Sequence, residues 1–273
     1  MELIIFREAA MRYSFNSYYL DAPLVKGRVF DVFFPEGDTR PLALFFVHGG
    51  GWRAGSRQSF HKFMEIFSDM GYAVASTDYR LDARDAFVQL TDVREAYARF
   101  VALLRERGVK NPRVAVMGES AGAHLASLLS YTEPRECGEE YVSEEPWVKP
   151  VLTVLAATPV DFCPFGEMLD SSRSMMESAA GVSYDECPEV YERLSLKNYI
   201  REDNPKTFFV EAELEHLFAS SDTRAVCDMH NAMGIGSQWK VYPKMEHGFL
   251  YTLTREGQRA AFADICSFLA ENE

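Results

Sequence analysis

The stretch Arg113-Val-Ala-Val-Met-Gly-Glu-Ser-Ala-Gly-Ala-His-Leu-Ala126 joins a short apolar run to a helix-forming run through a glycine and a serine. The apolar residues Val114–Met117 predict a buried strand, and Ala121–Leu129 predict the start of a helix. Gly118 and Gly122 flank the connection, as expected of a turn too tight for larger side chains. The pattern therefore predicts a strand, a sharp turn and a helix.

The serine in this turn is Ser120, and a turn of this kind is a nucleophile elbow. It lifts the hydroxyl above the sheet edge and places it at a helix N-terminus, where backbone N–H groups and the helix dipole favour negative charge. At ordinary residue frequencies, a Gly-x-Ser-x-Gly pattern arises by chance in about one chain in ten of this length. The motif therefore needs partners elsewhere in the chain.

Composition sets limits on the class of protein. The 273 residues fit one α/β domain spanning 1–273, with room for an inserted cap. A formal charge of −13 argues against a nucleic-acid or anionic-membrane partner and favours a neutral or cationic small molecule. No long apolar run and no signal-peptide pattern is visible, so we expect a soluble, cytoplasmic protein. The five scattered cysteines form no C-x-x-C pair, and we expect no disulfide framework, metal or organic cofactor.

Apolar runs alternate with helical spacing along the chain, which predicts a mostly parallel sheet. The expected strands are 12–20, 28–34, 42–47, 72–77, 113–117, 151–156, 207–211 and 238–242, the first two forming a hairpin. The expected helices are 60–70, 90–107, 121–129, 220–233 and 256–270. The segment 159–203 breaks this alternation, and we interpret it as a cap over the carboxyl edge of the sheet.

A serine nucleophile needs a base that takes its proton, and in the order Ser, acid, His the base follows Ser120. The candidates are His216, His230 and His247. His247 follows the last predicted strand in a loop and can reach the sheet edge, whereas His230 lies within a predicted helix and is expected to face the surface. We therefore predict His247 as the base.

The acid should follow the strand 207–211. Glu211 is expected in the strand and Asp222 in the next helix, which leaves Glu213 and Glu215 in the loop between them. Position favours Glu215, but Glu213 stays open. The whole segment is acidic, so a merely solvated glutamate is a third interpretation.

The loop Gly49-Gly50-Gly51 follows the buried strand 42–47 and can turn its amides toward the same sheet edge. We predict that the N–H groups of Gly50, Gly51 and Ala121 form an oxyanion hole. His48 is expected to brace this loop by hydrogen bonds.

Other residues near these motifs have less specific expectations. His124, one helical turn beyond Ser120, is expected to pack, and Glu119 at most to brace the site. Four aromatic residues are candidates for lining a substrate pocket, although each fits a core position equally well: Trp52, Phe162, Phe165 and Phe218.

Four motifs together resemble the serine esterases of the α/β-hydrolase superfamily, in the carboxylesterase and acetyl esterase branch that includes hormone-sensitive-lipase-like and feruloyl-esterase-like enzymes. They are His48-Gly-Gly-Gly-Trp52, Thr77-Asp-Tyr-Arg80, Gly118-Glu-Ser-Ala-Gly-Ala-His-Leu-Ala126 and His247-Gly-Phe249. The resemblance runs from Leu42 to the C-terminus and is weakest over the cap. It implies an α/β-hydrolase fold, with Ser120 as nucleophile, His247 as base and the loop glycines with Ala121 as oxyanion hole.

One departure from this family concerns the acid. Relatives usually carry His-Gly-x-x-Asp after the penultimate strand, whereas this chain reads Glu211-Ala-Glu-Leu-Glu215. Glutamate is a known alternative to aspartate at this position. The resemblance therefore implies Glu215 as the acid.

The expected function is hydrolysis of carboxylic esters through an acyl-enzyme, with short acyl groups because no apolar stripe indicates a lipid tunnel. Arylformamide hydrolysis is an alternative, since kynurenine formamidases resemble this chain at the glycine loop and at Ser-Ala-Gly-Ala-His. A non-catalytic ligand-binding protein on the same fold is an alternative of another class. Its signature would be a missing serine or histidine, and both are present. The sequence names neither the substrate nor the oligomeric state.

Overall fold

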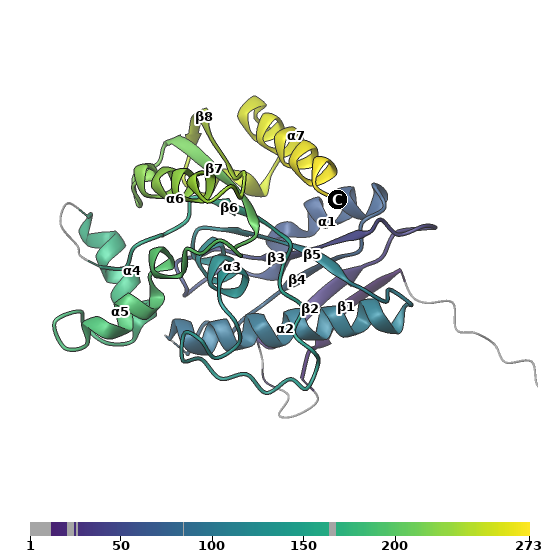
Figure 1. Cartoon of the computed structure of the whole chain (residues 1–273), viewed down its shortest axis with the longest axis horizontal. Helices are drawn as coiled ribbons and strands as arrows, with labels where there is room; N and C mark the ends of the chain where they lie inside the picture. The colour runs from purple at the N-terminus through teal and green to yellow at the C-terminus, as the bar shows by residue number, and fades with distance from the viewer. Residues whose placement is uncertain (1–11, 21–24, 26, 84, 164–167) are drawn as a thin grey trace, which may run out of the picture.

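The computed structural model describes residues 12–20, 25, 27–83, 85–163 and 168–273. Within these ranges the chain forms an eight-stranded sheet in the order β1-β2-β4-β3-β5-β6-β7-β8 (Figure 1). Strands β3 to β8 run parallel, while β2 pairs antiparallel with both β1 and β4. The strands are β1 (Tyr13–Tyr18), β2 (Val29–Phe33), β3 (Leu42–Val47), β4 (Val74–Thr77), β5 (Arg113–Glu119), β6 (Leu152–Ala156), β7 (Lys206–Leu214) and β8 (Gln238–Glu246).

Helices cover both faces of the sheet (Figure 1). They are α1 (His61–Asp69), α2 (Ala86–Glu106), α3 (Ala121–Tyr131), α4 (Asp170–Ala180), α5 (Pro188–Leu194), α6 (Ser220–Ala232) and α7 (Glu256–Glu271), with short 3₁₀ turns η1 (Arg57–Phe60), η2 (Leu196–Tyr199) and η3 (Phe249–Tyr251). Strand β3 sends Leu44 and Phe46 into the core under α1 and α7, and Phe45 and Val47 into the core under α2, α3 and α6. Burial on both faces explains the uninterrupted apolar run of β3.

The predicted α/β-hydrolase fold, a mostly parallel sheet between two layers of helices, is confirmed, and several elements are longer than the sequence indicated, α2, β7 and β8 most of all. Helix α2 begins at Ala86, because the Asp85 side chain accepts hydrogen bonds from the first free N–H groups of the helix. Strands β7 and β8 pair beyond their buried parts, with a register shift between Ala212 and Leu214. Glu213 therefore lies in a strand and not in a loop as predicted.

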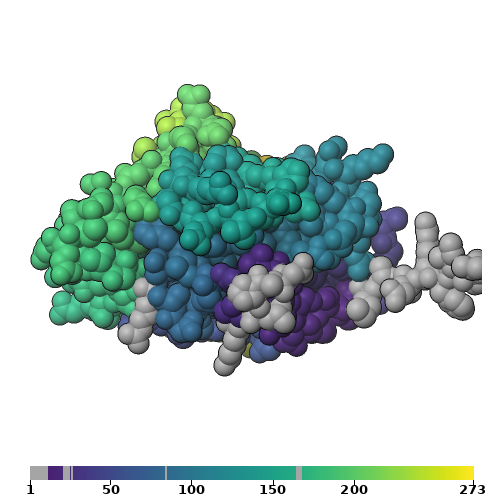
Figure 2. Space-filling model, turned by 90° about the horizontal axis from the view of Figure 1, so that it is seen from below, coloured from purple at the N-terminus to yellow at the C-terminus, as the bar shows by residue number. Residues whose placement is uncertain are grey.

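The segment 159–203 contains α4, α5 and η2 between β6 and β7. Figure 1 shows α4 and α5 together at one end of the sheet, and in Figure 2 the green surface of this segment forms that end of the molecule. Met176 and Tyr191 are buried in the core shared with α3, and Ser172 donates a hydrogen bond to the carbonyl of Leu217 at 2.9 Å. These contacts fasten the segment to the domain, and its role as a cap stays a prediction.

In the described ranges, every helix is too short or too polar to span a membrane. The five cysteines are free. Among the described residues, no three acidic, histidine or cysteine side chains gather as a metal site would require.

Candidate active site

The candidate residues follow the carboxyl ends of four parallel strands. The glycine loop follows β3, Ser120 follows β5, Glu215 follows β7 and His247 follows β8. In open parallel sheets these ends face the same edge, which is where ligands bind. The topology therefore brings together segments that lie up to two hundred residues apart in the chain.

Ser120 occupies a strained backbone position between β5 and α3. Its φ of 56° and ψ of −124° lie outside the regions that residues other than glycine favour. A Cβ added at Gly118 would lie 2.4 Å from the carbonyl oxygen of Gly122, and one added at Gly122 would lie 2.2 Å from that of Val47. The turn therefore requires glycine on both sides of the serine.

A chain of two hydrogen bonds connects Ser120, His247 and Glu215. The Ser120 hydroxyl donates to His247 Nε2 at 2.8 Å, and His247 Nδ1 donates to Glu215 Oε2 at 2.7 Å, in the tautomer that this carboxylate selects. The structure thus brings the predicted nucleophile, base and acid into direct contact. This geometry can move a proton from the serine to the imidazole and stabilise the imidazolium that results.

Glu215 is held as a charged acceptor. Burial alone would raise the pKa of Glu215, but hydrogen bonds from His247 and from the backbone N–H of Leu217 lower it below its usual range. Glu213 instead accepts a hydrogen bond from the backbone N–H of Lys244 at 2.8 Å and is exposed. Of the two glutamates left open by the sequence, Glu215 is the one that contacts the histidine.

The predicted oxyanion donors lie beside the serine. The first N–H groups of a helix have no acceptor within it, and Ala121 is the first residue of α3. Within the described ranges no hydrogen bond occupies the N–H of Gly50 or Gly51, whereas the N–H of Gly49 donates to the Tyr251 hydroxyl at 2.7 Å. Three free amides can therefore face an oxygen bound at Ser120.

A cavity of about 270 Å³ opens at Ser120. Two apolar side chains narrow it, Met175 from α4 and Leu217 from the loop after β7. Its full lining is Gly50, Gly51, Ser120, Met175, Leu217, His247, Gly248 and Tyr251. A neighbouring cavity of about 380 Å³ shares Leu217 and reaches Phe218 and Asp222.

The four aromatic candidates have different outcomes. Trp52 and Phe162 are 1% and 0% exposed and pack against each other and against His124, so they belong to the core and not to the cavity lining. Phe218 lies beside His247, with ring centroids 5.8 Å apart. Phe165 lies outside the described residues.

Sequence reasoning did not assign Met175, Leu217 or Tyr251 to the site. Tyr251 follows His247 by only four residues, and this spacing is the one local signal that pointed to it. Met175 and Leu217 reach the cavity only through the packing of α4 against the loop after β7.

Two other histidines are buried neutral groups. Burial lowers the pKa of His124 to about 4, and its ring contacts the carbonyl oxygen of Leu194. Burial likewise lowers the pKa of His230 to about 4. The expectation that His230 faces the surface is wrong, because α6 turns this side chain toward Tyr131 and Phe209 under the sheet.

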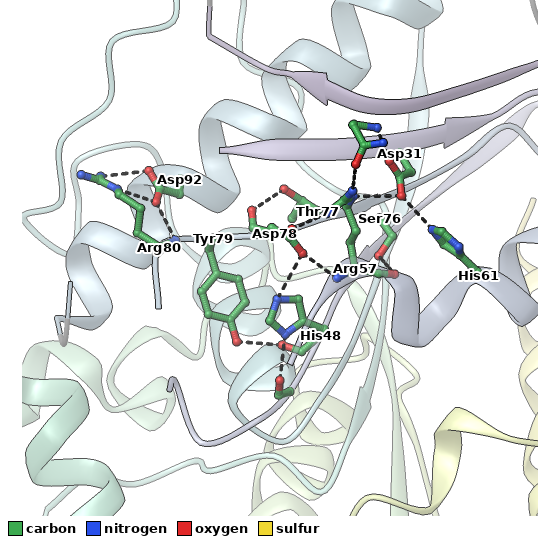
Figure 3. A network of polar contacts seen from close by, with 12 residues as sticks. Asp31, His48, Arg57, His61, Ser76, Thr77, Asp78, Tyr79, Arg80 and Asp92 are labelled. Atoms are coloured by element: carbon green, nitrogen blue, oxygen red, sulfur yellow. Dashed lines mark hydrogen bonds and ion pairs between the residues drawn. The ribbon is translucent and has the colours of Figure 1, made fainter. Parts of the chain in front are cut away.

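A polar network supports the glycine loop (Figure 3). His48 donates to the carbonyl oxygen of Gly49 at 2.8 Å and stacks on Tyr79, whose hydroxyl donates to the His48 carbonyl at 2.9 Å. Burial lowers the pKa of His48, so it braces the loop as a neutral ring. Arg57 joins Asp78 to Asp31, its Nε lying 2.9 Å from Asp31.

The parallel sheet, the serine turn and the adjoining histidine and carboxylate define a protein of the α/β-hydrolase superfamily. The chain has 33% identity over 168 residues to the non-reducing polyketide synthase atr1 of Stereocaulon alpinum, covering 57% of this chain and 6% of that protein. It has 35% identity over 107 residues to the arylacetamide deacetylase of Oryctolagus cuniculus, covering 36% of this chain and 27% of that protein. The chain thus spans less than a third of either relative.

A solved structure has the same fold over nearly its whole length. It is a thermophilic esterase of Thermogutta terrifontis with propionate bound, which matches with a TM-score of 0.73 and 20% identity over 93% of each chain. The model of the BD-FAE family matches residues 30–226. The chain belongs to the BD-FAE family.

Proposed function

We propose that the protein is a serine esterase that hydrolyses carboxylic esters with short acyl groups. The observation that carries this proposal is the hydrogen-bonded series from Ser120 through His247 to Glu215, which opens on a cavity beside free backbone amides. Family membership and the esterase among the structural neighbours support the same reaction class.

In the proposed mechanism, His247 takes the Ser120 proton as the Ser120 oxygen attacks the ester carbonyl. The N–H groups of Gly50, Gly51 and Ala121 bind the oxyanion, and Glu215 stays ionised beside the imidazolium. His247 then gives the proton to the departing alcohol oxygen, which leaves an acyl-enzyme on Ser120. A water molecule then attacks the acyl-enzyme carbonyl and gives one proton to His247. The carboxylic acid leaves as His247 returns this proton to the Ser120 oxygen.

The small cavity supports the short-acyl preference. Its volume of about 270 Å³ is bounded by Met175 and Leu217, and a long acyl chain would have to displace them. The propionate in the Thermogutta esterase agrees with a short acyl group in that relative. We therefore propose acetyl to butyryl esters as preferred substrates.

Steady-state assays with p-nitrophenyl acetate, butyrate and octanoate, and with an N-formyl aryl amide, test this proposal. We expect the two short esters to be turned over fastest, and Ser120→Ala to lose about 10⁴-fold or more in kcat. Ser267→Ala, an exposed serine on α7, is the matched control and should equal the wild type.

Selective turnover of the formamide would contradict the proposed ester hydrolysis. It would instead indicate that the same residues hydrolyse an amide. Ester turnover that survives Ser120→Ala would overturn the mechanism. Binding of an ester without turnover would favour the non-catalytic alternative.

A further inference from the structure

Tyr251 lies in the cavity wall next to the proposed nucleophile. It ends η3, four residues after His247, and its hydroxyl accepts the N–H of Gly49 at 2.7 Å. A Cβ added at Gly49 would lie 2.8 Å from the Tyr251 oxygen and 3.2 Å from Ser120 Cβ. The phenol and the serine side chain therefore meet at the same residue of the glycine loop.

The Tyr251 hydroxyl has a proton to donate. A phenol has one donor and can also accept, and here Gly49 takes the acceptor role. None of the described residues accepts the Tyr251 proton, and the cavity lies beside it. Burial raises the pKa of Tyr251 far above its usual value, so this proton is retained.

The position of Tyr251 is fixed from two sides. Its ring packs on Phe60 with centroids 5.1 Å apart, and the N–H of the preceding Leu250 donates to the Glu119 carboxyl at 3.1 Å. Glu119 is buried and directly precedes Ser120 in the chain. The segment that carries Tyr251 is thus tied to the turn that carries the nucleophile.

We propose that Tyr251 is a further catalytic residue, whose hydroxyl donates a hydrogen bond to the carbonyl oxygen of the ester as negative charge develops on it. This inference rests on the proposed esterase function. The Tyr251 hydroxyl accepts the hydrogen bond of the Gly49 N–H, and Gly50 and Gly51 are the next two residues of the loop. The phenol therefore lies at the start of the predicted oxyanion hole. Accepting the Gly49 N–H also polarises the O–H bond, which strengthens it as a donor.

Tyr251→Phe removes the hydroxyl and keeps the ring. Removing one oxyanion donor costs about 10²–10³ in kcat in a related type of site, and we expect about 100-fold here with KM nearly unchanged. The matched control is Tyr242→Phe, which should leave the rate unchanged. The Tyr242 hydroxyl donates to the Asp264 carboxylate at 2.7 Å and does not line the cavity. A Tyr251→Phe rate equal to that of Tyr242→Phe would overturn the inference.

Fluorinated tyrosine at position 251 separates proton donation from bracing of Gly49. Fluorine makes the phenol a stronger donor and a weaker acceptor. Direct donation predicts that the neutral-pH rate is kept or rises, because fluorine strengthens the O–H donor. A lower neutral-pH rate would contradict donation, because bracing of Gly49 depends on the acceptor that fluorine weakens.

The Ser120→Ala variant distinguishes the two levels of failure. Retained activity in Ser120→Ala would remove the esterase mechanism itself. An inactive Ser120→Ala beside a fully active Tyr251→Phe would contradict only the role of Tyr251.

Discussion

His247 and His61 each place a ring nitrogen within hydrogen-bond distance of a carboxylate, 2.7 Å from Glu215 and 2.8 Å from Asp31. Their surroundings differ. The second nitrogen of His247 meets the Ser120 hydroxyl beside a cavity, whereas His61 packs against the rings of Phe15 and Phe33.

The two carboxylates also differ in what else they bind. Asp31 is shared with the guanidinium of Arg57, so a fixed cation already neutralises it. Glu215 has backbone N–H groups and the imidazole as partners, and its charge remains available to an imidazolium. A histidine–carboxylate pair thus also occurs in this chain as a structural feature, and it becomes a candidate for catalysis only beside a nucleophile and an open cavity.

The largest effect is expected from breaking the pair of His247 and Glu215 at the candidate active site. Glu215→Gln keeps the shape but removes the charge, and it should lower kcat by about 10³–10⁴-fold, as in other serine hydrolases whose acid is made an amide. Glu213→Gln, two residues away and turned to Lys244, is the matched control and should keep the wild-type rate. Equal losses in the two variants would show that Glu215 has no special role.

The structural pair should respond in the opposite way. Asp31→Asn removes the buried carboxylate that Arg57 and His61 share. Losing one partner of a buried ion pair costs about 3–5 kcal/mol of stability, and the loss here should be smaller because Arg57 keeps its ion pair with Asp78. We expect a lower unfolding temperature in calorimetry, with kcat/KM of the remaining folded enzyme within a few-fold of the wild type. A large loss of kcat/KM at unchanged stability would erase the distinction between the two pairs.

A third kind of carboxyl is Glu211, which is buried and has neither a histidine nor a cation as its partner among the described residues. Its substitution should give the smallest of the expected effects. Burial raises the pKa of Glu211 to about 8, although Thr223 donates a hydrogen bond to it. The folded state therefore holds this proton where the unfolded chain has lost it, so the contribution of Glu211 to stability falls as pH rises from about 5 through 8.

Glu211→Gln should remove this dependence. In thermal unfolding from pH 5 to 9, the unfolding temperature of the variant should rise relative to that of the wild type as the pH rises. A difference that stays constant across this range would mean that Glu211 is charged in the folded state.

The sequence predicted the serine turn and most strands because both depend on local features. Glycines flank Ser120 because a Cβ added at either position would lie 2.2–2.4 Å from a backbone oxygen, and strands such as β3 are buried and apolar on both faces. The same local logic identified His247, which directly follows a strand end.

Features that depend on tertiary packing could not be predicted. The choice between Glu213 and Glu215 needed the true end of β7, whose last two residues, Glu213 and Leu214, are exposed and so do not continue the buried pattern of the strand. Trp52 is an aromatic beside the glycine loop in sequence, but its side chain turns into the core. Met175 joins the site only through the fold, and Tyr251 lies just beyond the His247-Gly-Phe249 motif, with its spacing from His247 as the one local signal.

The most direct test of the central claim is covalent labelling of the nucleophile. A p-nitrophenyl alkylphosphonate should release one equivalent of p-nitrophenol and add one phosphonyl group to the intact protein, and peptide mapping by mass spectrometry should place it on Ser120. Ser120→Ala should take up none. A stable adduct on another residue, or labelling that Ser120→Ala leaves unchanged, would contradict the assignment of Ser120 as the nucleophile.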